Sequence, residues 1–383
     1  MSFISKRVET AAETAELHRI WSWVWSSEAP SSDDPLSEPD PGEIRMLGEL
    51  DGVAVCGLKV HDYLVARGSA DLRCGGVGAV ATMPEARGKG CANQIMVDAL
   101  REMREAGHVI SNLYAFREPF YRNAGYATCG WRWRIKAPQS RLAKTEQRLD
   151  ARQLMPDEIQ QVDECYTKFV RTFSGSVLRT DHQWKSRLPK KLPMIYAVGD
   201  PIEAYAWVKL KDFWGDVEVG ELAWSSVAGY DSIMAVLRNL AVNQSHVVWR
   251  EPPSSSLLTS NLDQGVEMKL DEPTMYRVLD VPGALAGLAP ESTGAFSIEV
   301  SDELLPENRG PWRVAFSPDG VCVEACDSAD LAMDIRQFSQ ALMGQPSVIE
   351  IARAGLLEAK SEAVVDEAAK LLTAMPVCCM EFF

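Results

Sequence analysis

The chain has 383 residues, of which 46% are hydrophobic and 24% are charged, so it is a globular protein long enough for two or three domains. Its formal net charge of −15 argues against nucleic acid or an anionic membrane as a partner and suits a cationic substrate. Nine cysteines without a C-x-x-C pair, and only five histidines, argue against a metal site. Because the sequence shows no signal peptide or membrane-length apolar run, we expect a cytoplasmic protein with reduced thiols.

The first part of the chain alternates between strand and helix patterns. Asp51-Gly52 is typical of the tight turn in a β-hairpin, and Gly107 is placed to end a helix. The expected strands are 3–8, 44–50, 53–60, the run into Pro84, 109–115 and 131–135, and the expected helices are 11–25, 91–106 and a short turn at 120–123.

The segment between the strand that ends near Pro84 and the helix at 91–106 reads Arg87-Gly-Lys-Gly-Cys-Ala92, an R-x-x-G-x-A pattern. A helix N-terminus has unsatisfied N–H groups and a partial positive charge, so it binds phosphate readily. Gly88 and Gly90 allow close approach of the backbone, and the neighbouring arginine and lysine add charge. The pattern therefore predicts a pyrophosphate-binding loop.

A dinucleotide-binding fingerprint is an alternative interpretation, because Gly76, Gly78 and Ala81 spell G-x-G-x-x-A. That fingerprint must open a helix at the turn itself. Here residues 80–84 are still strand-like, so we discount it.

Two further units follow a charged, glutamine-rich linker at 137–152. In the second unit we expect helices at 156–173 and 231–243 and strands at 195–198, 204–209, 217–224 and 246–249. This order repeats the first unit, but residues 224–230 lack the cation and the glycine spacing, so no phosphate site is expected there. The third unit has expected helices at 283–288, 330–342 and 363–374, strands at 294–300, 312–317 and 321–325, and an apolar final segment at 377–383 that favours a docked strand.

The loop resembles the [QR]-x-x-G-x-[GA] loop of the GNAT acetyltransferases. Three more features resemble their Eis-type (enhanced intracellular survival) branch: the segment 113–126, the segment 276–282 and an aromatic last residue. The resemblance implies an α+β chain in which a catalytic GNAT domain (1–137) precedes a GNAT-like domain without an acetyl-CoA site (138–282) and a sterol-carrier-protein-like domain (283–383). It also implies a homohexamer.

The resemblance further implies that acetyl-CoA is the co-substrate and places its contacts on three segments. These are Val80, Ala81 and Thr82; then Arg87, Gly88, Lys89, Gly90, Cys91, Ala92 and Asn93; and then Phe116 and Arg117. Two positions depart from the family pattern, which often has a second arginine at Gly88 and valine at Thr82. The first departure shifts phosphate pairing towards Lys89.

The same resemblance implies two catalytic groups. Tyr121, in an F-Y-x-x-x-G-Y segment, is the acid for the departing thiolate, whereas Tyr126 is structural. The carboxylate of Phe383, whose segment reaches back to the active site, is the base. A lysine-like amine with a pKa near 10.4 is mostly protonated at neutral pH, so a base beside it is required.

An acceptor pocket for a polycation is expected where aromatic and acidic residues occur together. The candidates are Trp21, Trp25, Glu28, Asp33, Asp34 and Glu381. We expect an N-acetyltransferase for amines of a polycationic small molecule such as an aminoglycoside, with direct transfer in a ternary complex. The alternatives are an Nε-lysine acetyltransferase of a protein or peptide and, from a different class, a ligand- or lipid-binding protein.

Overall fold

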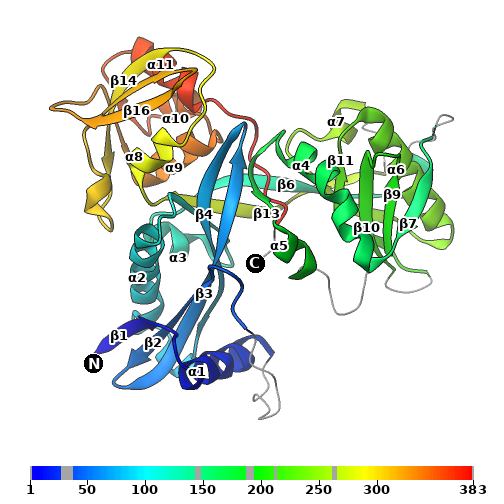
Figure 1. Cartoon of the computed structure of the whole chain (residues 1–383), viewed down its shortest axis with the longest axis horizontal. Helices are drawn as coiled ribbons and strands as arrows, with labels where there is room; N and C mark the ends of the chain where they lie inside the picture. The colour runs from blue at the N-terminus through cyan, green and yellow to red at the C-terminus, as the bar shows by residue number, and fades with distance from the viewer. Residues whose placement is uncertain are drawn as a thin grey trace.

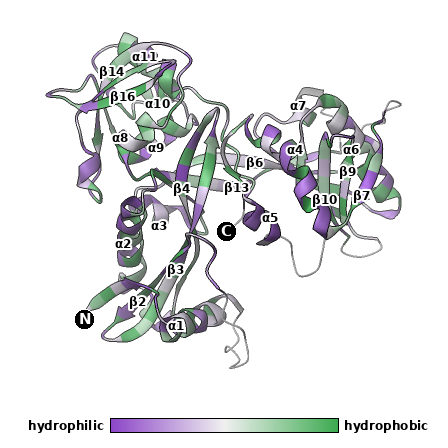
Figure 2. Cartoon of the chain, viewed as in Figure 1, coloured by the Kyte–Doolittle hydropathy of each residue, from purple (hydrophilic) through white to green (hydrophobic). Residues whose placement is uncertain are grey.

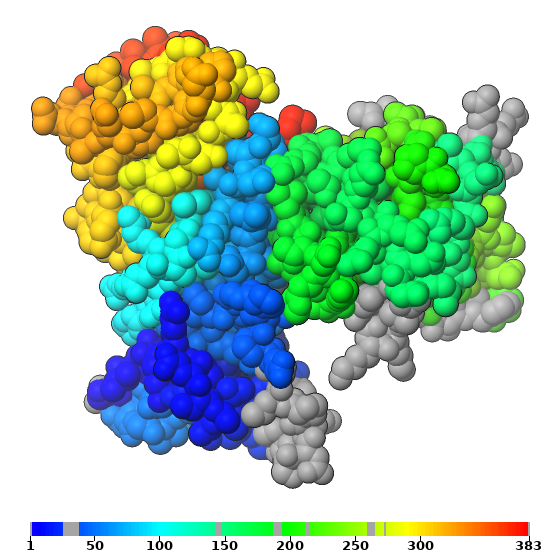
Figure 3. Space-filling view, in the orientation of Figure 1, coloured from blue at the N-terminus to red at the C-terminus, as the bar shows by residue number. Residues whose placement is uncertain are grey.

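The computed structural model describes residues 2–26, 38–142, 148–186, 194–210, 214–260 and 265–381. These form three lobes that contact one another (Figures 1 and 3). The strands of the N-terminal lobe are β1 (Phe3–Arg7), β2 (Ile44–Leu50), β3 (Val53–Arg67), β4 (Ala70–Thr82), β5 (Ile110–Tyr114) and β6 (Ala127–Ala137), and its helices are α1 (Ala11–Trp21), α2 (Cys91–Glu105) and α3 (Glu118–Asn123).

The middle segment adds strands and short helices. Its strands are β7 (Ala151–Leu154), β8 (Ser174–Leu178), β9 (Met194–Val198), β10 (Ala204–Leu210), β11 (Val217–Trp224), β12 (Val247–Glu251) and β13 (Glu267–Val278), and its helices are α4 (Asp163–Val170), α5 (Asp181–Ser186), α6 (Val227–Leu240) and α7 (Ser256–Ser260). Within the described residues, one 13-stranded sheet runs through both lobes in the order β1-β2-β3-β4-β5-β13-β6-β12-β11-β10-β9-β7, with β8 paired to β3.

The last strand of the middle segment completes the sheet of the first lobe. β13 lies between β5 and β6 and is antiparallel to both. The sequence pattern missed this strand, because it carries Pro273 and several charges. Proline cannot donate a hydrogen bond to a sheet, and the register of β13 shifts between Asp271 and Thr274, on either side of it.

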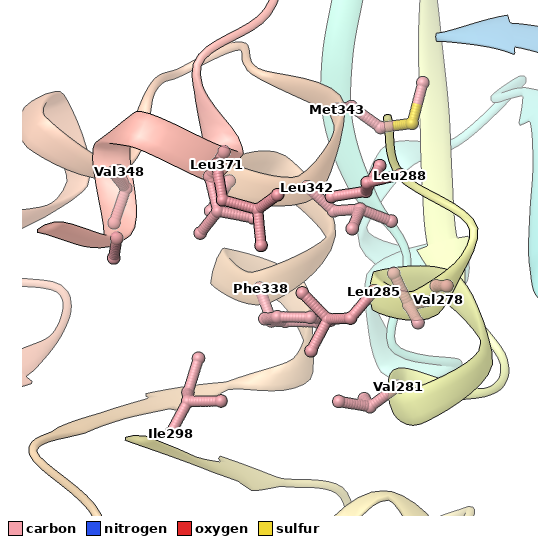
Figure 4. Packing of buried hydrophobic residues seen from close by; sticks show 14 of the residues in the cluster. Val278, Val281, Leu285, Leu288, Ile298, Phe338, Leu342, Met343, Val348 and Leu371 are labelled. Carbon is pink, nitrogen blue, oxygen red and sulfur yellow. The ribbon is translucent and has the colours of Figure 1, made fainter. Parts of the chain in front are cut away.

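The C-terminal lobe is a separate small α+β unit, which confirms the predicted fold class. Its elements are α8 (Val281–Ala286), β14 (Gly294–Ser301), β15 (Trp312–Ser317), β16 (Gly320–Ala325), β17 (Leu331–Asp334), α9 (Ile335–Met343), α10 (Val348–Arg353), β18 (Glu358–Ala359) and α11 (Glu362–Leu372). Its core packs Leu285 of α8 with Phe338 and Leu342 of α9 and Leu371 of α11 (Figure 4). The same core cluster continues into the first lobe through Val65 of β3 and Leu72 of β4.

Arg67 at the end of β3 ties this lobe to the first one. Its guanidinium is buried and donates to the carbonyl oxygens of Leu342 at 2.9 Å and Leu372 at 2.8 Å, in the last turns of α9 and α11. Helix ends leave such carbonyls without intrahelical partners and carry partial negative charge, so one cation caps two helices.

The segment after α11 leaves the C-terminal lobe and runs back between the other two lobes (Figure 1). It pairs through its backbone with Ser174 at the start of β8. The Ser174 N–H donates to the Pro376 carbonyl at 3.0 Å, and the Ser174 carbonyl accepts from the Cys378 N–H at 2.8 Å. Residues 377–381 are all buried. We call residues 376–381 the C-terminal segment.

No helix among the described residues combines the length and the apolar character needed to cross a bilayer. Hydrophilic residues occur in all three lobes (Figure 2).

Candidate active site

The first feature of the site is a separation between β4 and β5. The two parallel strands pair only from Cys74–Gly76 to Ile110–Asn112, although β4 continues to Thr82. Ala79 has a positive φ of 50°, and the register between β3 and β4 shifts near it. The unpaired edge of β4 therefore leaves backbone groups available to a ligand.

A cavity of about 530 Å³ opens at this separation. It is lined by Trp25, Val77, Gly78, Ala79, Val80, Tyr114, Ala115, Phe116, Tyr121 and Pro273. The wall is mostly apolar, with one tyrosine from α3 and one from β5. Such a mixture is typical of a pocket that buries a ligand and orients it with a few polar groups.

Tyr121 and Tyr126 have different hydroxyl environments. Tyr126 is fully buried, and its hydroxyl lies 2.7 Å from Ser111 Oγ, which also donates to the Gly75 carbonyl. The Tyr121 hydroxyl has no hydrogen-bond partner among the described residues, and its ring stands edge-on to Phe116 and Phe120. Burial raises the pKa of Tyr121, so its proton is present at neutral pH.

The second feature is the loop before α2. Gly88 and Gly90 have φ values of 76° and 83°, in the left-handed region that favours glycine, and a Cβ on either would meet open space. Gly90 is the N-cap of α2 and provides no side-chain cap. Within the described chain, the N–H groups of Cys91, Ala92 and Asn93 have no acceptor. The loop thus has the geometry of an anion site.

The basic side chains of this loop are exposed, and Arg87 Nε donates to the Thr82 carbonyl at 3.2 Å. That bond keeps the loop against the end of β4. The corresponding helix of the middle lobe, α6, is different. Ser226 caps it by accepting from Gly229 N–H at 2.9 Å, and its hydroxyl donates to the carboxylate of Glu203. An acidic side chain therefore already lies at that helix end.

A second cavity, of about 570 Å³, lies between β3 and the middle lobe. It is lined by Asp40, Pro41, His61, Asp62, Tyr63, Leu64, Arg73, Leu178, Thr180, His182, Gln183, Ser186 and Glu381. We call it the acidic cavity, because three carboxylates and one arginine face it. Although burial acts in the opposite direction, hydrogen bonds from Arg73 and His108 lower the pKa of Asp62, so this carboxylate is ionised.

His61 is a neutral member of this wall. Burial, together with Lys59 and Arg45, lowers the pKa of His61 to about 4, and the opposing effect of Asp40 is smaller. Asp40, Glu43 and His61 place potential metal-ligand atoms within 4.8 Å of one another. However, Glu43 already pairs with Arg45, so its charge is compensated and we assign no metal to this cluster.

The structure brings four of the predicted site residues together. Val80, Phe116, Tyr121 and Trp25 line the cavity beside β4, although Trp25 was predicted to bind the acceptor. Glu381 lines the acidic cavity, and Trp21 Nε1 donates to the Ala79 carbonyl at 2.8 Å. Of the remaining predicted positions, residues 87–90 form the loop before α2 and residues 91–93 form its first turn. Arg117 is the N-cap of α3. Glu28, Asp33, Asp34 and Phe383 lie outside the described residues.

Sequence reasoning missed the acidic cavity. His61, Asp62 and Tyr63 follow one another in β3, and His182 comes from α5, 121 positions after His61 by number. The only local signal was the run of polar and aromatic residues in an otherwise apolar strand.

Comparison with known proteins agrees with this geometry. An acetyltransferase (GNAT) domain matches residues 6–129, and a sterol carrier protein domain matches residues 281–380. An uncharacterized N-acetyltransferase of Streptomyces coelicolor is 23% identical over 312 residues, 75% of each chain. The crystal structure of a GCN5-related N-acetyltransferase from Anabaena variabilis has a TM-score of 0.88 at 18% identity, with both chains fully covered.

The protein is therefore an acyltransferase with a GNAT domain at its N-terminus and a sterol-carrier-protein-like domain at its C-terminus. Its fold over the whole chain is that of Eis1 from Mycobacterium abscessus, with a TM-score of 0.79 at 18% identity and full coverage of both chains. The fold class expected from the sequence, with a sterol-carrier-protein-like domain at the C-terminus, is thus confirmed. That the middle lobe is a second GNAT-like domain remains a prediction.

Proposed function

We propose that the protein transfers the acetyl group of acetyl-CoA directly to an amine of a polycationic small molecule, such as an aminoglycoside. The observation that carries this proposal is the cavity at the β4–β5 separation, in which the Tyr121 hydroxyl is free to reach a ligand. The GNAT domain supports the acyl transfer, and the acidic cavity supports the choice of a cationic acceptor.

Acetyl-CoA fits the residues of the N-terminal lobe. The uncapped first turn of α2, with Gly88, Gly90 and the exposed Arg87 and Lys89, suits a pyrophosphate. The free edge of β4 from Val80 to Thr82 offers N–H groups to the pantetheine amides and the thioester oxygen. In the middle lobe the Glu203 carboxylate would repel a phosphate at α6, which supports a single acetyl-CoA site per chain.

The chemistry requires proton transfers at the nitrogen and at the sulfur. The amine nitrogen attacks the thioester carbon, the C–S bond breaks, and the sulfur takes a proton from Tyr121. A base, for which we propose the carboxylate of Phe383, first takes a proton from the acceptor ammonium so that the neutral nitrogen can attack. The second proton, which the nitrogen loses after the attack, returns to the Tyr121 phenolate. Glu381, two positions before Phe383, lies in the wall of the acidic cavity, which supports the assignment of the base. Each group would contribute about 10²–10⁴ to the rate.

The acceptor class follows from the size and the charge of the acidic cavity. A volume of about 570 Å³ suits a small molecule. Asp40, Asp62 and Glu381 come from three separate parts of the chain. Asp62 is paired with Arg73 and Glu381 with Arg179, so an acceptor ammonium group would share these carboxylates with the two arginines. A homohexamer, which the Eis-type resemblance implies, remains a prediction that light scattering would test.

The test is release of free thiol from acetyl-CoA with matched acceptors: kanamycin as a polycationic aminoglycoside, a lysine-containing peptide and a simple monoamine. We expect turnover with kanamycin to exceed turnover with the other two. Preference for the peptide would favour the lysine acetyltransferase alternative. Failure of every amine to release thiol would refute the proposed function.

A further inference from the structure

A buried ion cluster joins the middle lobe to the C-terminal segment. Arg179, just after β8, donates from both terminal nitrogens to Glu221 of β11, at 2.8 and 2.7 Å, and from Nε to Glu381 at 2.5 Å. The three side chains are at most 5% exposed. This fork geometry is the strong form of an arginine–carboxylate pair.

The surroundings hold the arginine in a single orientation. Its guanidinium carbon lies 4.0 Å from the ring centre of Tyr166 and 4.3 Å from that of Trp184. The Tyr205 hydroxyl donates to Glu221 at 2.7 Å and so orients the carboxylate that holds Arg179. Although burial acts against it, Glu221 and Glu381 raise the pKa of Arg179 well above its ordinary value, so it stays charged.

Other contacts bring the C-terminal segment to this arginine. The Ser176 hydroxyl donates to the Cys378 carbonyl, and the Tyr114 hydroxyl donates to the Cys379 carbonyl at 3.2 Å. Gly130 leaves room for Val377, since a Cβ there would lie 2.6 Å from the Val377 side chain. Tyr114 also lines the cavity beside β4, and Glu381 lines the acidic cavity, so the segment passes between the two cavities.

We propose that Arg179 is a positioning residue that fixes Glu381, and with it the C-terminal segment, in the wall of the acidic cavity for binding the acceptor. This role rests on the proposed function. Because one cation is shared by two carboxylates, the cluster keeps one net negative charge. Glu381 thus stays anchored and still presents charge to an ammonium group of the acceptor.

Two variants separate the effect of the position of Glu381 from the effect of its charge. In the double variant Arg179→Met/Glu221→Gln the net charge of the cluster remains −1, but Glu381 loses its ion pair and keeps the longer contact, 3.4 Å, from the Tyr166 hydroxyl. In Glu381→Gln the net charge becomes zero, whereas a hydrogen bond to Arg179 is still possible. Glu164→Gln, which removes an exposed partner of Lys168 in the same lobe, is the matched control.

The first readout, amide hydrogen exchange of residues 377–381 in the full chain, requires no acceptor. We expect the double variant to exchange at least about tenfold faster, the effect of losing one charge-assisted hydrogen bond. The control should exchange like the wild type. Wild-type exchange in the double variant would overturn the proposal.

The second readout is steady-state kinetics with kanamycin. We expect Glu381→Gln to raise the KM for kanamycin about tenfold with little change in the KM for acetyl-CoA, and the double variant to lower kcat/KM for kanamycin. Faster exchange with unchanged kcat/KM would refute the positioning role. A wild-type protein inactive with every amine would refute the proposed function, while hydrogen exchange would still test the anchor.

A third variant is available should the double variant fail to fold. Gly130→Ala pushes against Val377 from the opposite end of the segment and leaves the ion cluster intact. It should also accelerate exchange at 377–381 and lower kcat/KM for kanamycin. Unchanged values for both would contradict the link between the segment and acceptor binding.

Discussion

The rings of Tyr121 and Tyr126 stand edge to face with their centres 6.3 Å apart, but of the two only Tyr126 has a hydrogen-bond partner for its hydroxyl among the described residues. Tyr126 bonds to Ser111 in the core, whereas Tyr121 lines the cavity beside β4. The two residues therefore form a matched pair for testing catalysis against structure.

We expect Tyr121→Phe to lower kcat by about 10²–10⁴ while leaving the affinity for acetyl-CoA nearly unchanged, because only the proton donor is lost. Tyr126→Phe should retain turnover and lose about 1 kcal/mol of unfolding free energy with its buried hydrogen bond. Thiol-release kinetics and urea unfolding measure the two effects. Full turnover in Tyr121→Phe would remove this residue from the mechanism.

Substitution of Gly90 tests whether the loop before α2 binds the pyrophosphate of acetyl-CoA. Gly90→Ala places a Cβ on a residue with φ 83° at the start of α2, so we expect about 1 kcal/mol of strain and weaker binding of acetyl-CoA. Gly355→Ala is the control, since that glycine has φ 69°, also faces open space and lies in the C-terminal lobe. Calorimetric titration with acetyl-CoA should separate the two variants. Equal affinities would place the pyrophosphate elsewhere.

Substitution of Arg67 tests how much its hydrogen bonds to the C-terminal lobe contribute to stability. Arg67→Met leaves the carbonyls at the ends of α9 and α11 without their buried donor, and we expect a loss of roughly 3 kcal/mol in unfolding free energy. Arg353→Met, at an exposed position of α10, should change stability by no more than about 0.5 kcal/mol. Similar urea midpoints for both variants would show that the capping contacts contribute little.

His61 predicts a pH dependence of stability. Its pKa of about 4 in the folded chain lies below the ordinary value of 6.5, so between these values the unfolded chain binds a proton that the folded chain does not. Unfolding free energy should therefore rise with pH from 4 to 6.5, by up to roughly 3 kcal/mol from this residue. His61→Gln should flatten that part of the profile. A profile unchanged by the substitution would mean that the pKa of His61 is the same in the folded and the unfolded chain.

Local patterns predicted the donor side of the site because its parts are close in sequence. A buried strand, two glycines and a helix start within thirteen residues of one another between Val80 and Ala92, and physical chemistry relates that order to phosphate binding. The role of Tyr121, in a short helix before Gly125, was implied by the resemblance of its segment to the family pattern. The fold class and the acyltransferase activity, which the family resemblance implied, are confirmed, whereas the roles of individual residues remain predictions.

The acceptor side could not be predicted in the same way. Arg179, Glu221 and Glu381 meet only because β8, β11 and the C-terminal segment converge, and no periodicity relates residues 42 and 202 positions apart. β8 itself reads Ser-Gly-Ser-Val-Leu, a composition typical of a loop, and is a strand because it pairs with β3. Tertiary pairing decides such elements more than local propensity does.

The most direct test of the central claim follows the acetyl group itself. Wild-type protein is incubated with acetyl-CoA labelled in the acetyl group, with and without kanamycin, and the label is measured by mass spectrometry on the amine, on the protein and as free acetate. The proposed function predicts label on an amine nitrogen in the same amount as the thiol released, and none on the protein. Label retained on the protein, or found only as acetate, would contradict direct transfer to an amine.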